Sequence, residues 1–155
     1  MKQALRLTFV AALALTMFSC SKKYSFDESL EVTANHISGT WMLEKWSGGT
    51  LADGTYVYVE FTRRDQQFTM YDNIGSFSAR RRTGRYNITI SNGASVIQGQ
   101  YHYGTGDWQH RYIITDLTSS SMTWTAVDNA SDVSVYRRCE AVPEDILAEL
   151  PATEE

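Results

Sequence analysis

The side chains best suited to chemistry in this sequence are three histidines, His36, His102 and His110, and they match no ligand or catalytic pattern. His102 and His110 could approach each other across a hairpin, but two ligands do not make a zinc site. No nucleophile motif, phosphate-binding loop or matched pair of carboxylates accompanies them. The sequence therefore predicts structural histidines, no metal, no cofactor and no enzymatic activity.

Four arginines gather in the segment "ARRRTGR", at Arg80, Arg81, Arg82 and Arg85. Guanidinium groups grip phosphate and carboxylate groups through paired hydrogen bonds, so an anionic partner is one interpretation. A solvated hairpin beside a turn is the simpler interpretation, and the sequence favours it.

The most aromatic stretch, "YHYGTGDWQHRY", places Tyr101, Tyr103, Trp108 and Tyr112 around one hairpin. These rings could line a mouth that receives a flat or apolar ligand. They could equally pair across the two strands and hold the hairpin together, which is what such aromatic pairs do. The pairing role is favoured, and the two roles are compatible.

The N-terminal residues 1–19 combine a basic head, Lys2 and Arg6, with the uncharged apolar run "LTFVAALALTMF". The run is short for a membrane span, so it is predicted to be a signal peptide. The run ends in "MFSC", and this resembles the lipobox of bacterial lipoproteins, with Met17 and Phe18 departing from the usual letters. The resemblance implies lipidation of Cys20, and several acyl chains on one cysteine anchor stably.

The same resemblance implies a Gram-negative envelope lipoprotein. Ser21 after the cysteine resembles proteins sorted to the outer membrane, and "SKKYS" lacks an acidic surface-export signal, so the periplasmic leaflet is expected. Residues 20–35 are then a lipidated tether. Cys139 is left without a partner for an internal disulfide and is predicted to be a small buried residue.

Composition favours one domain that does not bind nucleic acid. The chain has 155 residues and a formal net charge of −4, and it is more acidic still without Lys2 and Arg6. Nucleic-acid binding favours a basic face, which an acidic chain of this kind does not suggest. From Cys20 onward the chain is long enough for one domain and short for two.

The middle of the chain alternates apolar and polar residues in short runs separated by turn residues. Eight strands are predicted, at residues 40–46, 55–62, 66–72, 84–90, 95–103, 108–115, 121–127 and 132–138. Consecutive hairpins favour a meander, and closing the meander removes its two exposed edges. The fold predicted over residues 36–139 is therefore an all-β, eight-stranded antiparallel up-and-down barrel, with a β-sandwich as the alternative.

Short helices are expected at both ends of this barrel. A helical turn precedes residue 39, and a C-terminal helix with a tail occupies residues 140–155, where Pro143 suits a first helical turn. Ile146, Leu147 and Leu150 could cover a patch of the barrel wall or mouth.

A Gly-x-Trp triplet, Gly39 to Trp41, stands at the head of the first strand. In this position it resembles the signature of the lipocalins, and the chain looks most like short lipocalin-like lipoproteins of Gram-negative anaerobes. The resemblance implies that Trp41 plugs the closed end and that a late-strand Arg packs across its ring. "TDL" at residues 115–117 partly resembles a further family motif. "ISGTW" and "TGRYNI" are also similar to avidin strands, but biotin is not carried over.

Arg137 is predicted to be the packing arginine because it shares the strand parity of Val133 and Val135, which are taken to face inward. Arg138 would then face outward unless a bulge changes the phase. Gly39 is expected to let the chain turn sharply before the strand.

An eight-stranded barrel holds either its own side chains or one small ligand. The predicted function is therefore a lipid-anchored module that binds a small apolar or aromatic ligand at an open mouth. The alternative is a filled barrel that binds an envelope protein or an anionic surface through its exterior. The candidate lining residues are Val57, Val59, Tyr86, Ile88, Tyr101, Tyr103 and Trp124.

Overall fold

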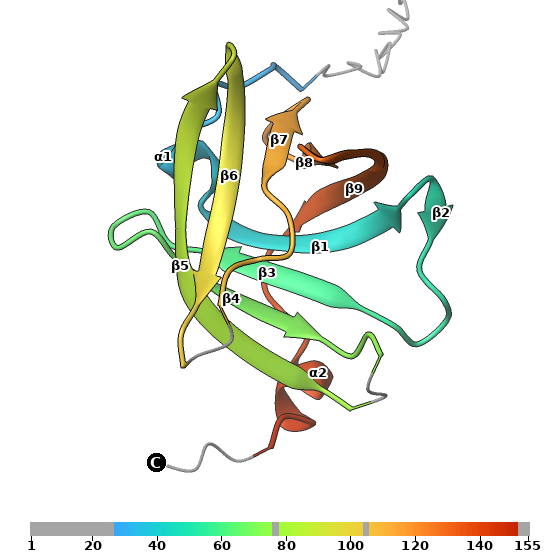
Figure 1. Ribbon diagram of the computed structural model, residues 1–155. Coiled ribbons are helices and arrows are strands. Elements are labelled where there is room, and N and C mark those ends of the chain that lie inside the picture. Colours follow the sequence, from blue (N-terminus) through green and yellow to red (C-terminus); the bar gives the residue numbers. More distant parts are fainter. Residues whose placement is uncertain (1–26, 76–77, 104–105, 152–155) are drawn as a thin grey trace, which may run out of the picture.

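The computed structural model describes residues 27–75, 78–103 and 106–151, and nearly all of its regular structure is β-strand (Figure 1). The predicted signal peptide, Cys20 and most of the tether lie outside the described residues. The helices and strands, in chain order, are α1 (Ala34–Ile37), β1 (Gly39–Trp46), β2 (Gly49–Thr50), β3 (Val57–Phe61), β4 (Gln67–Asp72), β5 (Arg80–Ser91), β6 (Ala94–Tyr101), β7 (Tyr112–Thr115), β8 (Ser121–Ala126), β9 (Asn129–Cys139) and α2 (Glu144–Ala148).

The strands close into a barrel of eight antiparallel members. Each strand from β3 to β9 pairs with the next along the chain, and β1 pairs with both β3 and β9. The two-residue β2 only extends the far end of β1. Because β1 and β9 meet, the sheet has no free edge among these eight strands. The prediction of an eight-stranded up-and-down barrel with two short flanking helices is confirmed.

Two strand boundaries differ from the sequence prediction. β5 begins at Arg80, so most of "ARRRTGR" is strand, and Arg80 and Arg82 pair with Asp72 instead of lying in a fully solvated hairpin. β7 begins at Tyr112, because the ladder after the isolated bridge between Gln100 and Asp107 is broken and the next residues leave the sheet. Because of these two differences, side chains from the start of β5 and from the loop before β7 lie at one end of the barrel. In a regular hairpin these side chains would lie outside it.

The opposite end of the barrel is filled with side chains. Trp41, Val59, Ile97 and Met122 are each fully buried in one continuous hydrophobic core, together with Phe61. Alternation along the strands explains this, because every second residue of an antiparallel strand faces the interior. The fully packed half of the barrel therefore has no room for a ligand.

The helix α1 lies against this closed end. Its first turn is capped by Thr33, whose hydroxyl oxygen accepts a hydrogen bond from the His36 amide at 3.2 Å. Its last residue, Ile37, is fully buried, and the Ile37 carbonyl accepts a hydrogen bond from the Trp41 indole Nε1 at 2.8 Å. The helix and the first strand are thus joined through the buried indole.

Arg138 covers the Trp41 ring, with its guanidinium carbon 4.1 Å from the ring centroid. The same guanidinium donates to three backbone carbonyls: Nε to Ser119 at 2.8 Å, Nη1 to Ser38 at 2.5 Å and Nη2 to His36 at 2.6 Å. A planar fork with five donors suits this task, since it can stack on a ring and bind several acceptors at once. One side chain therefore connects β9, α1, the start of β1 and the β7–β8 loop.

The prediction that Arg137 packs on Trp41 is wrong. Arg137 faces outward, where it pairs with Glu44, and its side chain is 61% exposed. Within β9 the inward positions are Ser134, Tyr136 and Arg138, with the first two buried. Val133 and Val135 lie on the outer face and are only half-buried, so their apolar character misled the assignment of parity.

Gly39 is required by this arrangement for two reasons. Its φ angle is +117°, a conformation that residues with a Cβ atom rarely adopt. A Cβ atom at this position would also lie 2.6 Å from Arg138 Nη1. The glycine therefore gives the arginine access to the carbonyls around it.

The N-terminal segment before α1 is held at the same closed end. The Leu30 amide donates to the Leu117 carbonyl at 2.8 Å, and the Ser120 hydroxyl donates to Asp27. Leu117 is itself 1% exposed within the main core, so this attachment is to a packed part of the barrel.

A second, smaller core lies outside the barrel wall, under α2. Tyr58 and Tyr71, on the outer faces of β3 and β4, are buried against Val142 and Ile146. Leu150 packs at its margin, whereas Leu147 is 42% exposed. The C-terminal helix therefore covers a patch of wall and leaves the mouth free.

Cys139 ends β9 beside this second core and is a free thiol. Burial, with Glu60 nearby, raises the pKa of this thiol. A raised pKa keeps the group protonated and poorly nucleophilic. Among the residues described, no helix has the length and apolar character needed to cross a membrane.

The closed end gives a first prediction. Trp41→Ala should lower the free energy of unfolding by about 3–5 kcal/mol, because it empties a buried ring-sized volume. Arg138→Ala should lower it by about 1–3 kcal/mol, since three carbonyls lose their donor. The matched control, Arg137→Ala, should change it by no more than about 0.5 kcal/mol, as expected for a surface position.

Urea denaturation of the single variants and of the Trp41→Ala/Arg138→Ala double variant measures these values. The double variant should lose less than the sum of the single losses, because the two side chains touch. A strictly additive result, or equal effects of the two arginine substitutions, would contradict the assignment of Arg138.

Candidate functional site

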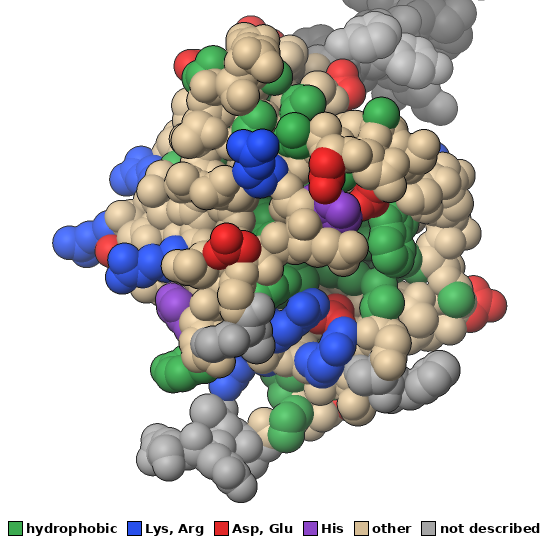
Figure 2. Space-filling view, in the orientation of Figure 1, with side chains coloured by type: hydrophobic (Ala, Val, Ile, Leu, Met, Phe, Trp, Pro, Cys, Tyr) green, Lys and Arg blue, Asp and Glu red, His purple; other side chains and the backbone are tan. Residues whose placement is uncertain are grey.

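The open end of the barrel contains a cavity of about 420 Å³. In Figure 2 it is the hollow in the middle of the face shown, with hydrophobic side chains inside it and Lys or Arg side chains along its lower edge. The residues that line it come from all of the barrel strands and from the loops at the mouth: Leu43, Trp46, Val57, Met70, Asp72, Ile74, Arg80, Arg82, Tyr101, Asp107, Trp108, Gln109, Tyr112, Trp124, Ser134 and Tyr136.

Aromatic rings form the inner wall of this cavity. The Trp124 ring centroid lies 4.8 Å from that of Tyr136, 5.4 Å from that of Tyr112 and 5.5 Å from that of Trp108. Phe68 continues the wall behind Trp108, at 5.0 Å. Rings packed edge to face and at a tilt present a rigid apolar surface, which suits a flat or apolar ligand.

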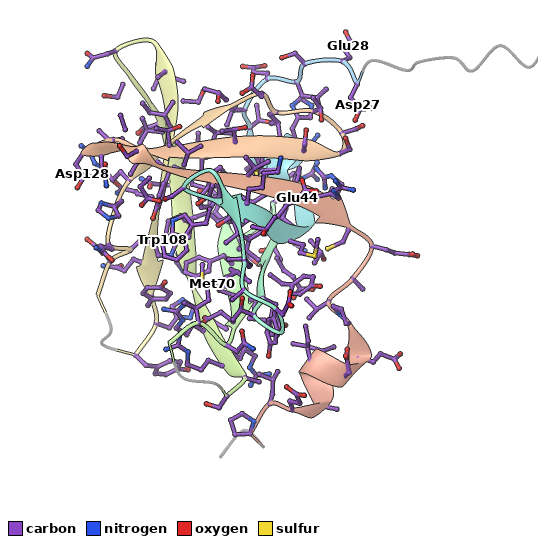
Figure 3. All side chains as sticks on the ribbon, turned by 90° about the vertical axis from the view of Figure 1, so that its right-hand side faces the viewer. Asp27, Glu28, Glu44, Met70, Trp108 and Asp128 are labelled. Atoms are coloured by element: carbon purple, nitrogen blue, oxygen red, sulfur yellow. The ribbon has the colours of Figure 1, made fainter. Side chains whose placement is uncertain are left out.

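Trp108 is the unexpected member of this wall, because it comes from a loop and not from a strand. It is 8% exposed and lies inside the barrel near Met70 (Figure 3). Its position depends on Gly99 of β6, where a Cβ atom would lie 2.1 Å from Cε2 of the indole. The Trp108 amide also donates to the Gly99 carbonyl at 2.8 Å.

The loop that carries Trp108 is attached to the neighbouring β8–β9 hairpin. His110 Nδ1 donates to the Asp128 carboxylate at 2.7 Å, and the Val127 amide donates to the Arg111 carbonyl at 2.8 Å. Within the described ranges no three side chains of the His, Cys, Asp and Glu types come together as a metal site would require. Asp128 of the β8–β9 hairpin is therefore a structural partner of His110.

The rim at β4 and β5 carries the charges of the cavity. Asp72 is 1% exposed and bridges two arginines: its Oδ1 accepts from Arg80, and its Oδ2 accepts from Arg82 Nη2 at 2.6 Å. Arg82 also lies over the Tyr101 ring, 5.1 Å from the centroid. A buried carboxylate needs such partners to remain ionised at low cost.

The tyrosines of the cavity remain neutral phenols over a wide pH range. Burial, with Asp132, Tyr101 and Asp128 nearby, raises the pKa of Tyr112 to about 12. Burial also raises the pKa of Tyr136 and Tyr101, although Arg82 works in the opposite direction at Tyr101. The negative charge of this region therefore comes from carboxylates alone.

Three of the seven predicted lining residues, Val57, Tyr101 and Trp124, lie on the cavity. Val59 and Tyr86 are buried deeper, and the Tyr86 hydroxyl donates to the Thr62 carbonyl in the β3–β4 loop, at the closed end. The assignment of these two residues to the ligand site is therefore wrong.

The other two predicted lining residues, Ile88 and Tyr103, also lie away from the cavity. Ile88 lies on the half of β5 that is remote from the mouth, where it pairs with β6 and packs on the filled core. Tyr103 is 97% exposed, because the chain leaves β6 after Tyr101. Strand alternation gives the face of a residue but not its depth along the barrel axis.

The residues that the sequence interpretation missed are Trp108 and the trio Asp72, Arg80 and Arg82. Trp108 stood in the aromatic stretch, but it was assigned to strand pairing. The available signal was Gly99, since a glycine inside a strand marks a close approach by another group. For the arginines the signal was their i, i+2 spacing beside an aspartate at the end of the preceding strand.

A family model for the lipocalin-like domain matches residues 37–124 of the chain. Among solved structures, the chain is similar to a lipocalin-like protein from Bacteroides uniformis ATCC 8492, with 15% sequence identity and a TM-score of 0.49. That similarity covers 67% of this chain and 99% of the other. No significant match to a curated protein is found.

The contact between Gly99 and Trp108 gives a second prediction. Gly99→Ala should destabilise the protein by about 1–3 kcal/mol, because the added methyl group overpacks against the indole. In a Trp108→Ala background the same substitution should cost less than about 0.5 kcal/mol, since the methyl group then has room. Chemical denaturation of the four proteins measures both values, and an equal cost in the two backgrounds would show that Trp108 does not lie on Gly99.

Proposed function

Since the chain belongs to the lipocalin-like domain family, whose barrel suits ligand binding in general, we propose that it binds a small apolar or aromatic molecule in the cavity at its open mouth. We further propose that it does so as a lipid-anchored envelope lipoprotein, attached through Cys20 to the periplasmic leaflet of the outer membrane. In this proposal the protein is a binding module and not an enzyme.

The cavity beside Trp124 is the observation that supports ligand binding. A filled barrel would place packed side chains beside Trp124, whereas about 420 Å³ is open there. This volume falls within the range of roughly 300–1,000 Å³ that is usual for small-molecule sites. The alternative of a filled barrel that acts only through its exterior is therefore disfavoured.

The character of the wall supports an apolar or aromatic ligand. Trp108, Trp124 and Tyr136 are each less than 10% exposed and are fixed by mutual packing. A preformed apolar site loses little conformational entropy when a ligand enters. A flat ring system would meet rings at the base of the cavity and aliphatic groups such as Val57 and Leu43 at its side.

The envelope location rests on the sequence before the described residues. The apolar run "LTFVAALALTMF", followed by Ser19 and Cys20, has the order of a signal peptide and lipidation site. Stable anchoring needs more than one acyl chain, and a lipobox cysteine carries several.

Binding is tested with N-phenyl-1-naphthylamine, an uncharged apolar dye that fluoresces in apolar surroundings. It should bind the purified protein with a dissociation constant on the order of micromolar, as a modest preformed cavity allows. Trp124→Ala should weaken this binding severalfold, with Trp124→Phe as the conservative variant if the alanine form does not fold. Arg81→Ala, on the exposed face of β5, is the matched control and should leave affinity unchanged. Absence of binding, or equal and negligible effects of the Trp124 and Arg81 substitutions, would favour the filled barrel.

Lipidation is tested separately, by radiolabelled palmitate in a Gram-negative host. The wild-type protein should incorporate label and sediment with membranes. Cys20→Ala should abolish both, and Cys139→Ala should change neither, because Cys139 belongs to the folded barrel. Label that survives Cys20→Ala would remove the anchor.

A further inference from the structure

The mouth cavity is lined by two arginines, Arg80 and Arg82, and by two aspartates, of which Asp72 is buried and Asp107 is exposed. We infer that its ligand is an amphiphile with a single anionic head group, such as a carboxylate or sulfonate, held by Arg82 while the apolar body lies on the aromatic wall. This inference rests on the proposed ligand-binding function and specifies the class of ligand.

Asp72 is the buried negative charge that faces the two arginines of the cavity. Both of its carboxylate oxygens are occupied, Oδ1 by Arg80 and Oδ2 by Arg82, and its side chain is 2% exposed. One buried carboxylate neutralises one guanidinium, and Arg80 alone would suffice, since its Nε and Nη2 both donate to Asp72. Arg80 Nη2 also donates to the Ile74 carbonyl at 2.6 Å, which fixes it to the β4–β5 loop. Arg82 therefore brings a positive charge beyond what Asp72 requires.

Arg82 also has hydrogen-bonding capacity that the described residues do not use. Its Nη2 donates to Asp72 and approaches the Met70 sulfur at 3.3 Å, whereas its Nε is buried with no partner among the described residues. A buried donor without an acceptor is unfavourable, and such groups are rare. The side chain is 36% exposed and lines the cavity, so an oxyanion at the mouth can reach the guanidinium. A small rotation of its plane would then offer Nε to the oxyanion as a charge-assisted donor.

The other acidic residue of the lining does not cancel this charge. Asp107 is exposed, and its carboxylate accepts a hydrogen bond from Gln100 Nε2 at 3.2 Å. Gln100 lies on the outer face of β6, since Gly99 and Tyr101 on either side face inward. Asp107 therefore lies at the exposed edge of the cavity, where water and salt screen its charge, whereas Arg82 faces the partly enclosed interior.

The positions of the charge and the rings fit one molecule. Arg82 stacks on Tyr101, and Tyr101 packs on Phe68, which in turn contacts Trp108. A head group at Arg82 is therefore continuous with the aromatic wall. A compound with an acid at one end and an apolar ring or chain at the other would satisfy both parts of the cavity.

A matched pair of dyes tests the inference. N-phenyl-1-naphthylamine is uncharged, and 8-anilinonaphthalene-1-sulfonate is the same ring skeleton with one sulfonate. The wild-type protein should bind the sulfonate roughly tenfold more tightly than the uncharged dye, as a charge-assisted hydrogen bond in a partly enclosed site allows. Arg82→Gln should remove this preference, so that the ratio of the two affinities falls to about one. Asp72 keeps Arg80 as its partner in this variant, so the rim should remain folded.

Arg81→Gln is the control, because it removes the same charge from the neighbouring exposed position of β5. It should keep the preference for the sulfonate, which excludes general attraction to a cationic surface. Equal affinities for the two dyes in the wild-type protein, or a preference that survives Arg82→Gln, would overturn the anionic head group while leaving the cavity intact. If neither dye binds, the proposed function fails along with it.

Discussion

The contact between Arg138 and Trp41 is the interaction on which the architecture depends. A barrel made of consecutive hairpins needs its first and last strands to meet, and backbone pairing between β1 and β9 does this. The guanidinium adds a second connection at their ends, because it stacks on the indole and binds carbonyls of α1 and of the β7–β8 loop. Closing that end with a buried ring leaves the mouth as the place where the interior can stay open.

The barrel interior is consequently divided into a half filled with side chains and a half that contains the cavity. Trp41, Ile97 and Met122 fill the first half completely. The second half is bounded by rings that support each other, with Trp108 folded in from a loop. Gly99 makes this possible, because a side chain on β6 would occupy the space of the indole. The wall of the cavity thus depends on the absence of a side chain at one strand position.

Local patterns predicted the strands and their order, because alternation and turn residues act over a few residues and survive in the folded barrel. The buried Trp41 was implied by the lipocalin resemblance. Local patterns did not predict which arginine covers Trp41, since Val133 and Val135 look like core residues although Ser134 and Tyr136 take the inward positions. Local patterns also did not predict the depth of a side chain along the barrel axis, because this depth follows from strand tilt and from the register between distant segments. The arginine rim was missed for a similar reason, since its partner Asp72 belongs to another strand.

The attachment of the N-terminal segment at the closed end sets how the molecule would face a membrane. Asp27 and Leu30 are held beside the β7–β8 loop, and Figure 3 shows Asp27 and Glu28 well away from Trp108 and Met70. The seven residues from the proposed anchor at Cys20 to Asp27 reach at most about 25 Å when fully extended. With the proposed anchor, the sealed end would face the bilayer and the mouth would face the aqueous space. In that arrangement a ligand would reach the mouth through water and not directly from the lipid.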